Sequence, residues 1–403
     1  MPSTTAFTAA LLLASSLSTA SAPSVPGQQT PPNAGPVPTD PWPAWPPPPL
    51  RRSEPRGYTV GLAIDVGAAS QLPQVPDPFT STGGEITIEP VTADNWTVAD
   101  LDRREVSLLL NGSTVPFESR VEGDPKADHR RLVVSVPDGV VNALTLRAGW
   151  PAIAFNSEVD ERAAATIAWP RQWPPEAQAA LQPSLAIDSD QPIFREFVAK
   201  VAGDELRRVP VYLAAKDLVR RSIMEFRNIQ GGALAREGLG AVRGFRLQGA
   251  SVAAEAGTGT PGDLVCVCVA VLRAAGIPAR PVIGIYSGDG DRGDNKLPSG
   301  RTTLCVWAEF HLPGAGWVPF DPNEMRGSGL PQANVRKPWR WFGTIDQLNR
   351  RVALTYEFAP IRQGFIQDWP AGWAWTISGV VRAPFRLVDV TTPILISRGR
   401  VRP

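Results

Sequence analysis

The sequence predicts an α+β protein in which a small β-sandwich-like domain precedes a second domain of helices packed on a sheet. Two patterns support this fold class. Between residues 57 and 165, short runs of alternating apolar and polar residues recur, as expected for strands with one buried face. Beyond residue 168, apolar residues recur at helical spacing before further strand-like runs. The 403 residues suffice for two such domains with terminal segments.

The first domain is predicted from three strand-like runs and one turn. The runs are 85–89, 106–110 and 132–136. Asn111 and Gly112 directly follow the second run, and Asn-Gly beside a strand is a strong signal for a two-residue hairpin. We therefore expect a small β-sandwich over residues 57–165.

The second domain is expected over residues 168–360. Apolar or small residues at 211, 215, 218, 219, 222, 226 and 229 share one face of a helix over 211–229. Another helix is expected over 261–275. The strand-like runs that follow are 278–285, 302–312, 316–320 and 352–358.

The two ends of the chain differ from both domains in composition. Residues 1–20 contain an apolar run followed by small residues, as in a secretory signal peptide. The run is too short to span a membrane, and residues 21–56 form a proline-rich linker. We therefore expect an exported protein (secreted, periplasmic or cell-surface) without a transmembrane segment. The tail over 361–403 is Trp-rich, which suits packing against the domains or stacking on sugars or peptides.

Charge and composition exclude several functions. Lys and Arg total 40 and Asp and Glu total 39, for a net charge of +1, whereas nucleic-acid binding usually needs a basic patch. The three cysteines do not make a disulfide framework. The acidic loop at 287–295 lacks the ligand spacing of a calcium loop. We expect no nucleic-acid partner, metal or cofactor.

Three motifs lie close together in the second domain. They are Gly276–Arg280, Val306–Glu309 and Gly316–Pro322. Their residues and spacing resemble the core of the transglutaminase-like superfamily, a branch of the papain-like cysteine-enzyme fold. The resemblance covers roughly residues 168–360. It implies helices packed on an antiparallel sheet and a Cys-His-Asp triad that carries out acyl transfer or hydrolysis through a thioester.

The resemblance also locates the three triad positions in this chain. The family's nucleophile opens a helix fifteen residues before the first motif, which places it at Pro261. The family's His corresponds to Cys305, and only Asp321 retains the family's residue type. Pro261 has neither a thiol nor a backbone N–H that could stabilise an oxyanion. It is nevertheless well suited to the first turn of a helix, so we expect the fold to remain and the family's chemistry to be lost.

The other cysteines and histidines are poor replacements for the missing groups. Cys266 and Cys268 lie within the expected helix and are interpreted as core residues. His311 is six residues along the strand from Cys305, roughly 20 Å away. His129 lies in a charged segment of the first domain and is interpreted as an exposed loop residue.

Three functional hypotheses follow. The leading one is a non-catalytic protein whose former thioester cleft binds a peptide or cell-wall polymer. A second is an active cysteine enzyme with a rewired nucleophile at Cys305, although a neighbouring Asp321 carboxylate would raise the pKa of that thiol. A third is a scaffold in which the cleft has no function. The sequence leaves the ligand and the oligomeric state open.

Overall fold

The computed structural model describes residues 46–68, 79–81, 83–125, 127–141, 143–229, 234–237, 241–286, 303–358, 375–378, 388–391 and 394–398. They belong to the compact unit that spans Trp42–Pro403. The expected signal peptide, most of the proline-rich linker, the acidic loop at 287–295 and most of the tail lie outside the described residues.

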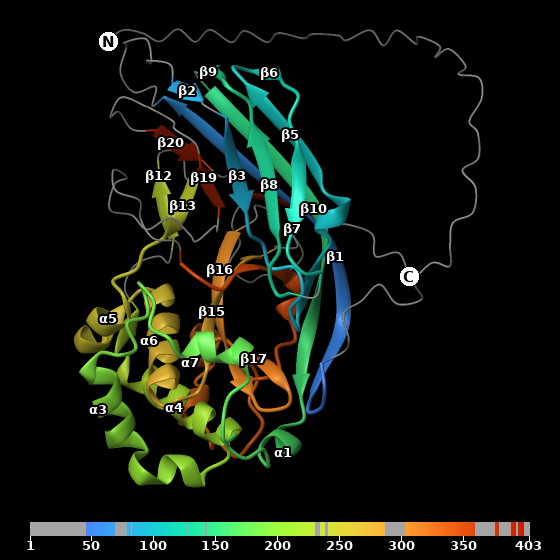
Figure 1. Cartoon of the computed structure of the whole chain (residues 1–403). Helices are drawn as coiled ribbons and strands as arrows, with labels where there is room; N and C mark the ends of the chain where they lie inside the picture. The colour runs from blue at the N-terminus through green and yellow to red at the C-terminus, as the bar shows by residue number, and fades with distance from the viewer. Residues whose placement is uncertain are drawn as a thin grey trace, which may run out of the picture. The chain divides into compact units, whose positions relative to one another are not determined.

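The first region is built from two antiparallel β-sheets (Figure 1). One sheet has the order β20-β1-β10-β5-β6, with β21 also paired to β1 and β4 to β10, and the other has the order β19-β3-β8-β7. A separate pair joins β2 and β9. The strands are β1 (Leu50–Ala68), β2 (Phe79–Ser81), β3 (Gly84–Ile88), β4 (Thr97–Ala99), β5 (Glu105–Leu110), β6 (Ser113–Thr114), β7 (Ser119–Glu122), β8 (Arg131–Val136), β9 (Gly139–Val141), β10 (Ala143–Val159), β19 (Trp375–Ser378), β20 (Val388–Thr391) and β21 (Ile394–Arg398).

The two sheets share a hydrophobic core, as the predicted β-sandwich requires. Leu132 and Val134 of β8 belong to this core with Ile86 of β3 and Leu146 of β10. Val133 lies on the opposite face of β8 and is buried as well, although it is not part of this cluster. The sandwich is therefore held together mainly by the burial of apolar side chains from both sheets.

The predicted hairpin is confirmed at the turn between β5 and β6. Leu110 pairs with Ser113, and the turn residues Asn111 and Gly112 have φ of 52° and 79°. Positive φ at both central residues is the signature of the type I′ turn, whose twist matches that of the flanking strands.

The first region extends beyond both predicted boundaries. β1 begins at Leu50, so the end of the segment 21–56, assigned to a linker, is strand: Leu50–Ser53 pair with residues of β10. From the tail over 361–403, three strands return to the sandwich, where β19 pairs with β3 and both β20 and β21 pair with β1. These pairings join residues far apart in the sequence, which local composition cannot reveal.

The second region packs helices on a four-stranded antiparallel sheet of order β17-β16-β15-β18 (Figure 1). The sheet strands are β15 (Ala279–Tyr286), β16 (Thr303–Leu312), β17 (Gly316–Phe320) and β18 (Arg351–Thr355). Two further pairs join β11 (Asn228–Ile229) to β14 (Thr258–Gly259) and β12 (Leu234–Glu237) to β13 (Ala241–Phe245). The helices are α1 (Glu161–Ala164), α2 (Pro175–Gln178), α3 (Pro192–Val201), α4 (Val211–Glu225), α5 (Ala250–Ala256), α6 (Pro261–Ala274) and α7 (Pro322–Gly327).

Helix α6 is the central helix of this region. It contacts α3, α4, α5, β15 and β16, and every residue from Gly262 to Leu272 is buried. A helix that is apolar on all sides is stable only when surrounded by other elements, which fixes the position of its first residue, Pro261.

The helix predicted over 211–229 is shorter in the structure. α4 ends at Glu225, and Asn228–Ile229 pair in parallel with β14 instead. The backbone N–H of Arg227 donates to the carbonyl of Gly257 at 2.7 Å. Hydrogen bonds to a distant segment thus override the helical pattern of residues 226 and 229.

The two regions share buried side chains at their junction. Ile285 of β15 and Val352 and Leu354 of β18 belong to the core of the sandwich. In return, Val91 and Trp96 of the sandwich region belong to the core of the second region. The junction is therefore packed like an interior rather than like a flexible linker.

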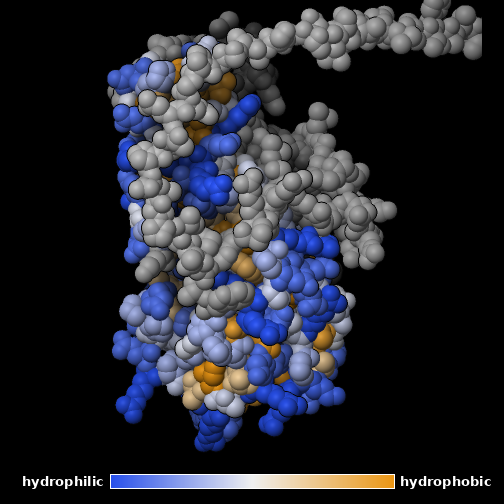
Figure 2. All heavy atoms as spheres, turned by 90° about the vertical axis from the view of Figure 1, so that its right-hand side faces the viewer, coloured by the Kyte–Doolittle hydropathy of each residue, from blue (hydrophilic) through white to orange (hydrophobic). Residues whose placement is uncertain are grey.

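The surface of the second region has few large exposed hydrophobic side chains. Leu185, Val209, Met224 and Val252 are the ones found among the described residues. Figure 2 shows one face, on which small hydrophobic areas alternate with hydrophilic ones. Within the described residues, the structure has no helix with the length and apolar character needed to cross a membrane.

Candidate functional site

The first triad position, Pro261, is held by the start of helix α6. Thr260 caps the helix: its hydroxyl accepts a hydrogen bond from the backbone N–H of Asp263 at 3.2 Å, and the Asp263 carboxylate accepts from the Thr260 N–H at 2.9 Å. This is a capping box. Pro261 stands at the first helical position, where the missing N–H costs little, so the helix start is stable with proline at the position that the resemblance assigned to the nucleophile.

Asp263 also accepts hydrogen bonds from the loop before helix α5. Its Oδ1 accepts hydrogen bonds from the backbone N–H groups of Gln248 at 2.7 Å and Gly249 at 3.3 Å. The side chain is fully buried. A buried carboxylate is stable when several N–H groups solvate it in this way. Asp263 therefore fixes the loop before α5 to the start of α6 and is not available as a general base.

The second position, Cys305, lies on β16 opposite Gly284 of β15. Its side chain is partly buried and packs against the core of the second region. Burial raises the pKa of the Cys305 thiol to about 12; the charge of Arg351 opposes this shift and that of Asp321 adds to it. At neutral pH the side chain is an uncharged thiol, which is neither a base nor an effective nucleophile.

The third position, Asp321, follows β17 and caps helix α7. Its Oδ1 accepts hydrogen bonds from the backbone N–H groups of Asn323 at 3.0 Å and Glu324 at 3.1 Å. Its Oδ2 forms an ion pair with Nη1 of Arg351 at 2.6 Å, and both side chains are at least 90% buried. Every acceptor that would orient an imidazole in the family's triad is engaged by the backbone or by Arg351.

The structure links the three positions through two residues. The Asn323 side-chain N–H₂ donates to the carbonyl of Pro261 at 3.1 Å, which ties the start of α7 to the start of α6. Arg351 interacts with both Asp321 and Cys305. Asn323 and Arg351 thus connect the surroundings of the three positions that the resemblance assigned to a triad.

Several polar atoms of this site are buried and unsatisfied. Among the described residues, Nε1 of Trp307, Nε of Arg351 and Oδ1 of Asn323 have no hydrogen-bond partner. The guanidinium of Arg351 lies 5.7 Å from the centroid of the Trp307 ring. A buried polar group without a partner costs about 1–3 kcal/mol, so leaving these three atoms without partners is unfavourable.

Arg351 is the residue that the sequence did not single out. It begins β18, which was predicted to start one residue later, and it lies opposite Tyr286 of β15. An Arg at the start of a strand is ordinary in a sequence. Arg351 could have been found by an electrostatic argument. A buried Asp321 carboxylate beside a neutral residue at position 305 is stabilised by a nearby cation.

The remaining cysteines and histidines do not join the site. Cys266 and Cys268 are fully buried in α6, and burial raises the pKa of both thiols. His311 packs edge-on between Trp173 and Trp317, and burial lowers its pKa to about 4. These three side chains are core residues rather than catalytic groups.

The expectation of an exposed His129 is wrong. This side chain is partly buried and stacks edge-on with Tyr356, with ring centroids 4.9 Å apart. Burial lowers the pKa of His129. The polar residues around it in the sequence suggested exposure, but Tyr356, which follows β18, covers the ring. Within the described part of the chain, no group of three or more His, Cys, Asp or Glu side chains is arranged to hold a metal.

Comparison with known proteins agrees with this geometry. Residues 239–322 match the family model of the transglutaminase-like superfamily. A 68-residue segment is 40% identical to a protein-glutamine gamma-glutamyltransferase of Pseudomonas aeruginosa, a match that covers 16% of this chain and only 10% of that protein.

One solved structure shares the fold over most of this chain. A protein from Cytophaga hutchinsonii, crystallised as a candidate cysteine protease, superposes with a TM-score of 0.50 at 14% identity, over 88% of this chain and 94% of its own. The periplasmic domain of TgpA from Pseudomonas aeruginosa is also similar, with a TM-score of 0.28 and 16% identity over 68% of this chain and 93% of that one. The family match therefore identifies a transglutaminase-like core at residues 239–322, and the first of these structures shares the fold of this chain.

Proposed function

We propose that this is an exported, non-catalytic transglutaminase-like protein that acts as a binding or scaffold module. The observation that carries the proposal is the buried ion pair between Asp321 and Arg351. Thioester chemistry needs a carboxylate that orients an imidazole, and an imidazole that activates a thiol. Here the Asp321 carboxylate is paired with Arg351 instead. A guanidinium group does not accept or release a proton near neutral pH.

Binding is favoured over a purely vestigial site by the unsatisfied polar atoms. Two donors, on Trp307 and Arg351, and one acceptor, on Asn323, are buried on residues that neighbour the former triad positions in the sequence or pair with Asp321. An extended peptide or a strand of cell-wall polymer offers both acceptors and donors at close spacing. We infer that such a polymer is held there without being cleaved, because no thiolate is present to attack it.

The N-terminal sequence supports export. Residues 6–17 are apolar and are followed by small residues, the composition of a secretory signal peptide. A peptide or cell-wall polymer would be met outside the cytoplasm. Fractionation of cells that produce the full chain tests this part of the proposal, which fails if the protein accumulates uncleaved in the cytoplasm.

An active enzyme with Cys305 as nucleophile is the alternative function. Its one supporting feature is that Cys305 keeps some exposure, unlike Cys266 and Cys268. A thiol with a pKa of about 12 is almost entirely protonated at pH 7. The alternative therefore predicts an activated thiol where the structure has an inert one.

The two functions are separated by labelling the folded, mature protein with a thiol-reactive electrophile at neutral pH and locating adducts by mass spectrometry. We expect slow labelling of Cys305 and none of Cys266 or Cys268 until denaturant is added. The Cys305→Ser variant is the control that assigns the adduct. Rapid, selective labelling of Cys305, together with turnover of an acyl substrate that the variant loses, would replace our proposal by the rewired enzyme.

Binding is tested directly by titrating peptides and soluble cell-wall fragments into the protein. Trp307→Phe removes the unsatisfied indole N–H and keeps a large aromatic ring, so we expect it to weaken binding. The matched control is Trp339→Phe, because Trp339 is equally buried but donates to the carbonyl of Asn334. If both variants bind equally well, Trp307 does not contact the ligand. The proposal of binding at this site would then fail, and only the scaffold function would remain.

A further inference from the structure

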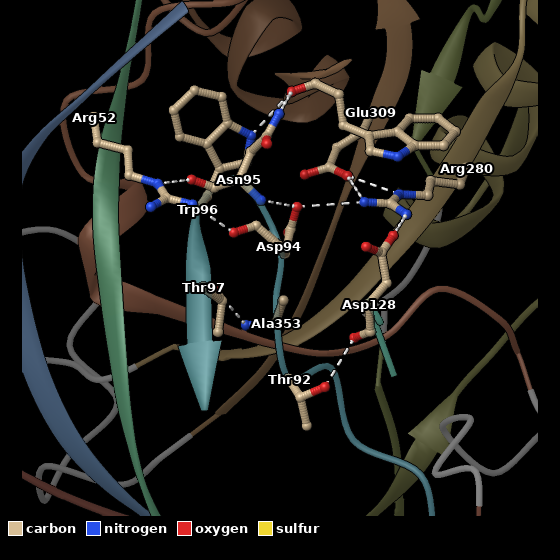
Figure 3. Close-up of polar contacts among 11 residues, drawn as sticks. Arg52, Thr92, Asp94, Asn95, Trp96, Thr97, Asp128, Arg280, Glu309 and Ala353 are labelled. Atoms are coloured by element: carbon tan, nitrogen blue, oxygen red, sulfur yellow. Dashed lines mark hydrogen bonds and ion pairs between the residues drawn. The ribbon is translucent and has the colours of Figure 1, made fainter. Parts of the chain in front are cut away.

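A buried ionic cluster joins the sandwich to the transglutaminase-like domain. At its centre is Arg280 of β15, whose guanidinium lies between the rings of Trp317 and Tyr356, 3.9 Å and 3.4 Å from their centroids. Three carboxylates converge on it (Figure 3). Glu309 of β16 is bonded at 2.8 Å, Asp128 at 3.0 Å and Asp94 at 3.4 Å.

These carboxylates come from both regions of the chain. Glu309 belongs to the sheet of the transglutaminase-like domain, whereas Asp94 and Asp128 belong to loops of the sandwich that follow β3 and β7. The side chains of Glu309 and Asp94 are 0% and 1% exposed, whereas that of Asp128 is 45% exposed. Water can therefore screen Asp128, but not the other two.

The charges of the buried groups do not balance. Two fully buried carboxylates face one buried guanidinium, and an uncompensated buried charge is far more costly than a protonated carboxyl group. Arg52 of β1 donates to the backbone carbonyl of Asp94, and the Asp94 charge attracts its guanidinium. Asp128 adds a third carboxylate on Arg280, so the carboxylates of the cluster still outnumber its guanidinium groups. Burial keeps His129 and His311 neutral.

An unsatisfied atom points to the same conclusion. Oε1 of Glu309 has no hydrogen-bond partner among the described residues, although Oε2 of the same carboxyl group accepts from Arg280. A carboxylate acceptor without a donor is unfavourable at a site that water does not reach. Oδ2 of Asp94 is likewise buried without a partner. A proton on one of the two carboxyl groups would remove the excess negative charge and supply an O–H donor where both groups now offer only acceptors.

We propose that Glu309 and Asp94 hold one proton between them at neutral pH, and that losing this proton weakens the junction between the sandwich and the transglutaminase-like domain. The protein thereby has a pH-sensitive joint, which does not depend on whether the former catalytic site binds a ligand. The proton leaves the carboxyl group for solvent when the cluster opens, and no other bond forms or breaks.

The sign and range of the pH dependence follow from the pKa shifts. Burial, together with the Asp94 charge, raises the pKa of Glu309 to about 8, and burial also raises that of Asp94. The folded protein thus keeps a proton that the unfolded chain releases near pH 4.5, so its stability falls as the pH rises from there to about 8. The neutral histidines act in the opposite direction, and their contribution fades as the pH rises through about 6.5 and is small above about pH 7.

The experiment is urea unfolding of the mature protein from pH 7 to 8, where the two histidines together change the unfolding equilibrium constant by less than about twofold. We expect the loss of the Glu309 proton to raise this constant by about fivefold over the same range. Glu309→Gln mimics the protonated carboxyl group and should make the constant nearly independent of pH. The matched control is Asp128→Asn, which removes the exposed carboxylate on the same guanidinium and should keep the pH dependence.

A second measurement stays decisive if Glu309→Gln does not fold. Infrared spectroscopy of the folded wild-type protein should show a protonated-carboxyl carbonyl band at pH 7 that disappears by pH 9. The proposal is overturned if that band is absent at pH 7, or if wild type and Glu309→Gln have the same pH dependence of unfolding.

Discussion

The ion pair between Arg351 and Asp321 makes the sharpest prediction. Arg351→Met keeps most of the side-chain volume and removes the charge, which leaves the Asp321 carboxylate 95% buried without a cation. At 2.6 Å the gross attraction is about 6 kcal/mol for an effective dielectric constant of 20. Part of this attraction offsets the desolvation of both groups, and breaking such a pair by removing one partner typically costs about 3–5 kcal/mol. We expect a loss of stability of that size.

The second arm of the cycle is Asp321→Asn. Asparagine is as good a helix cap as aspartate, so the hydrogen bonds from the backbone of Asn323 and Glu324 should survive. The loss in this variant then reports the unpaired guanidinium of Arg351. The double variant removes both charges and should recover much of the loss, because replacing a buried ion pair by neutral groups is often close to neutral.

Urea unfolding of the four proteins gives the coupling energy, which we expect to be about 3 kcal/mol. Unchanged denaturant slopes would show that the variants unfold from the same compact state. A coupling energy near zero, or a loss below about 1 kcal/mol in Arg351→Met, would refute the reasoning. In that case the Asp321 carboxylate would be free to orient another group, and the main support for a non-catalytic site would be lost.

Three further predictions concern single side chains. The Cys305 thiol should react about a thousand-fold more slowly at pH 7 than an ordinary exposed thiol, because its pKa is about 12, as timed by mass spectrometry. Gly284→Ala should destabilise the protein by about 1–3 kcal/mol in urea unfolding, because the added methyl would lie 2.6 Å from the Trp307 ring; an unchanged midpoint would contradict that contact. Lys216→Met should cost about 3–5 kcal/mol in the same assay, since the ammonium is fully buried against Glu161 at 2.6 Å; a loss below about 1 kcal/mol would show an exposed pair.

Local patterns in the sequence predicted most of the fold. Helix α6 was expected over 261–275 and is found at Pro261–Ala274, and β17 has its predicted bounds. In these elements a strong local period agrees with the tertiary packing. The predicted bounds were wrong where hydrogen bonds to distant segments determine the secondary structure. Residues 228–229 belong to β11 rather than to the helix, and β1 begins inside the expected linker.

The candidate site was predicted only in part, for the same reason. The motifs located Pro261, Cys305 and Asp321, because each lies in a segment with a recognisable pattern. Arg351 is 30 residues from Asp321, and Arg280 is 186 residues from Asp94. Ion pairs over such distances leave no period or spacing in the sequence, and they become visible only when the fold brings the charges together.

The substitutions at the former triad depend on one another electrostatically. A carboxylate buried like that of Asp321 needs a positive or hydrogen-bonding partner, and an imidazole at position 305 would provide one. Cys305 is neutral, so Asp321 would be a buried uncompensated charge if Arg351 did not neutralise it. The arginine satisfies the carboxylate permanently and cannot transfer a proton. A permanently charged pair at this place supplies no group that exchanges a proton, and this observation supports the proposed role in binding or scaffolding.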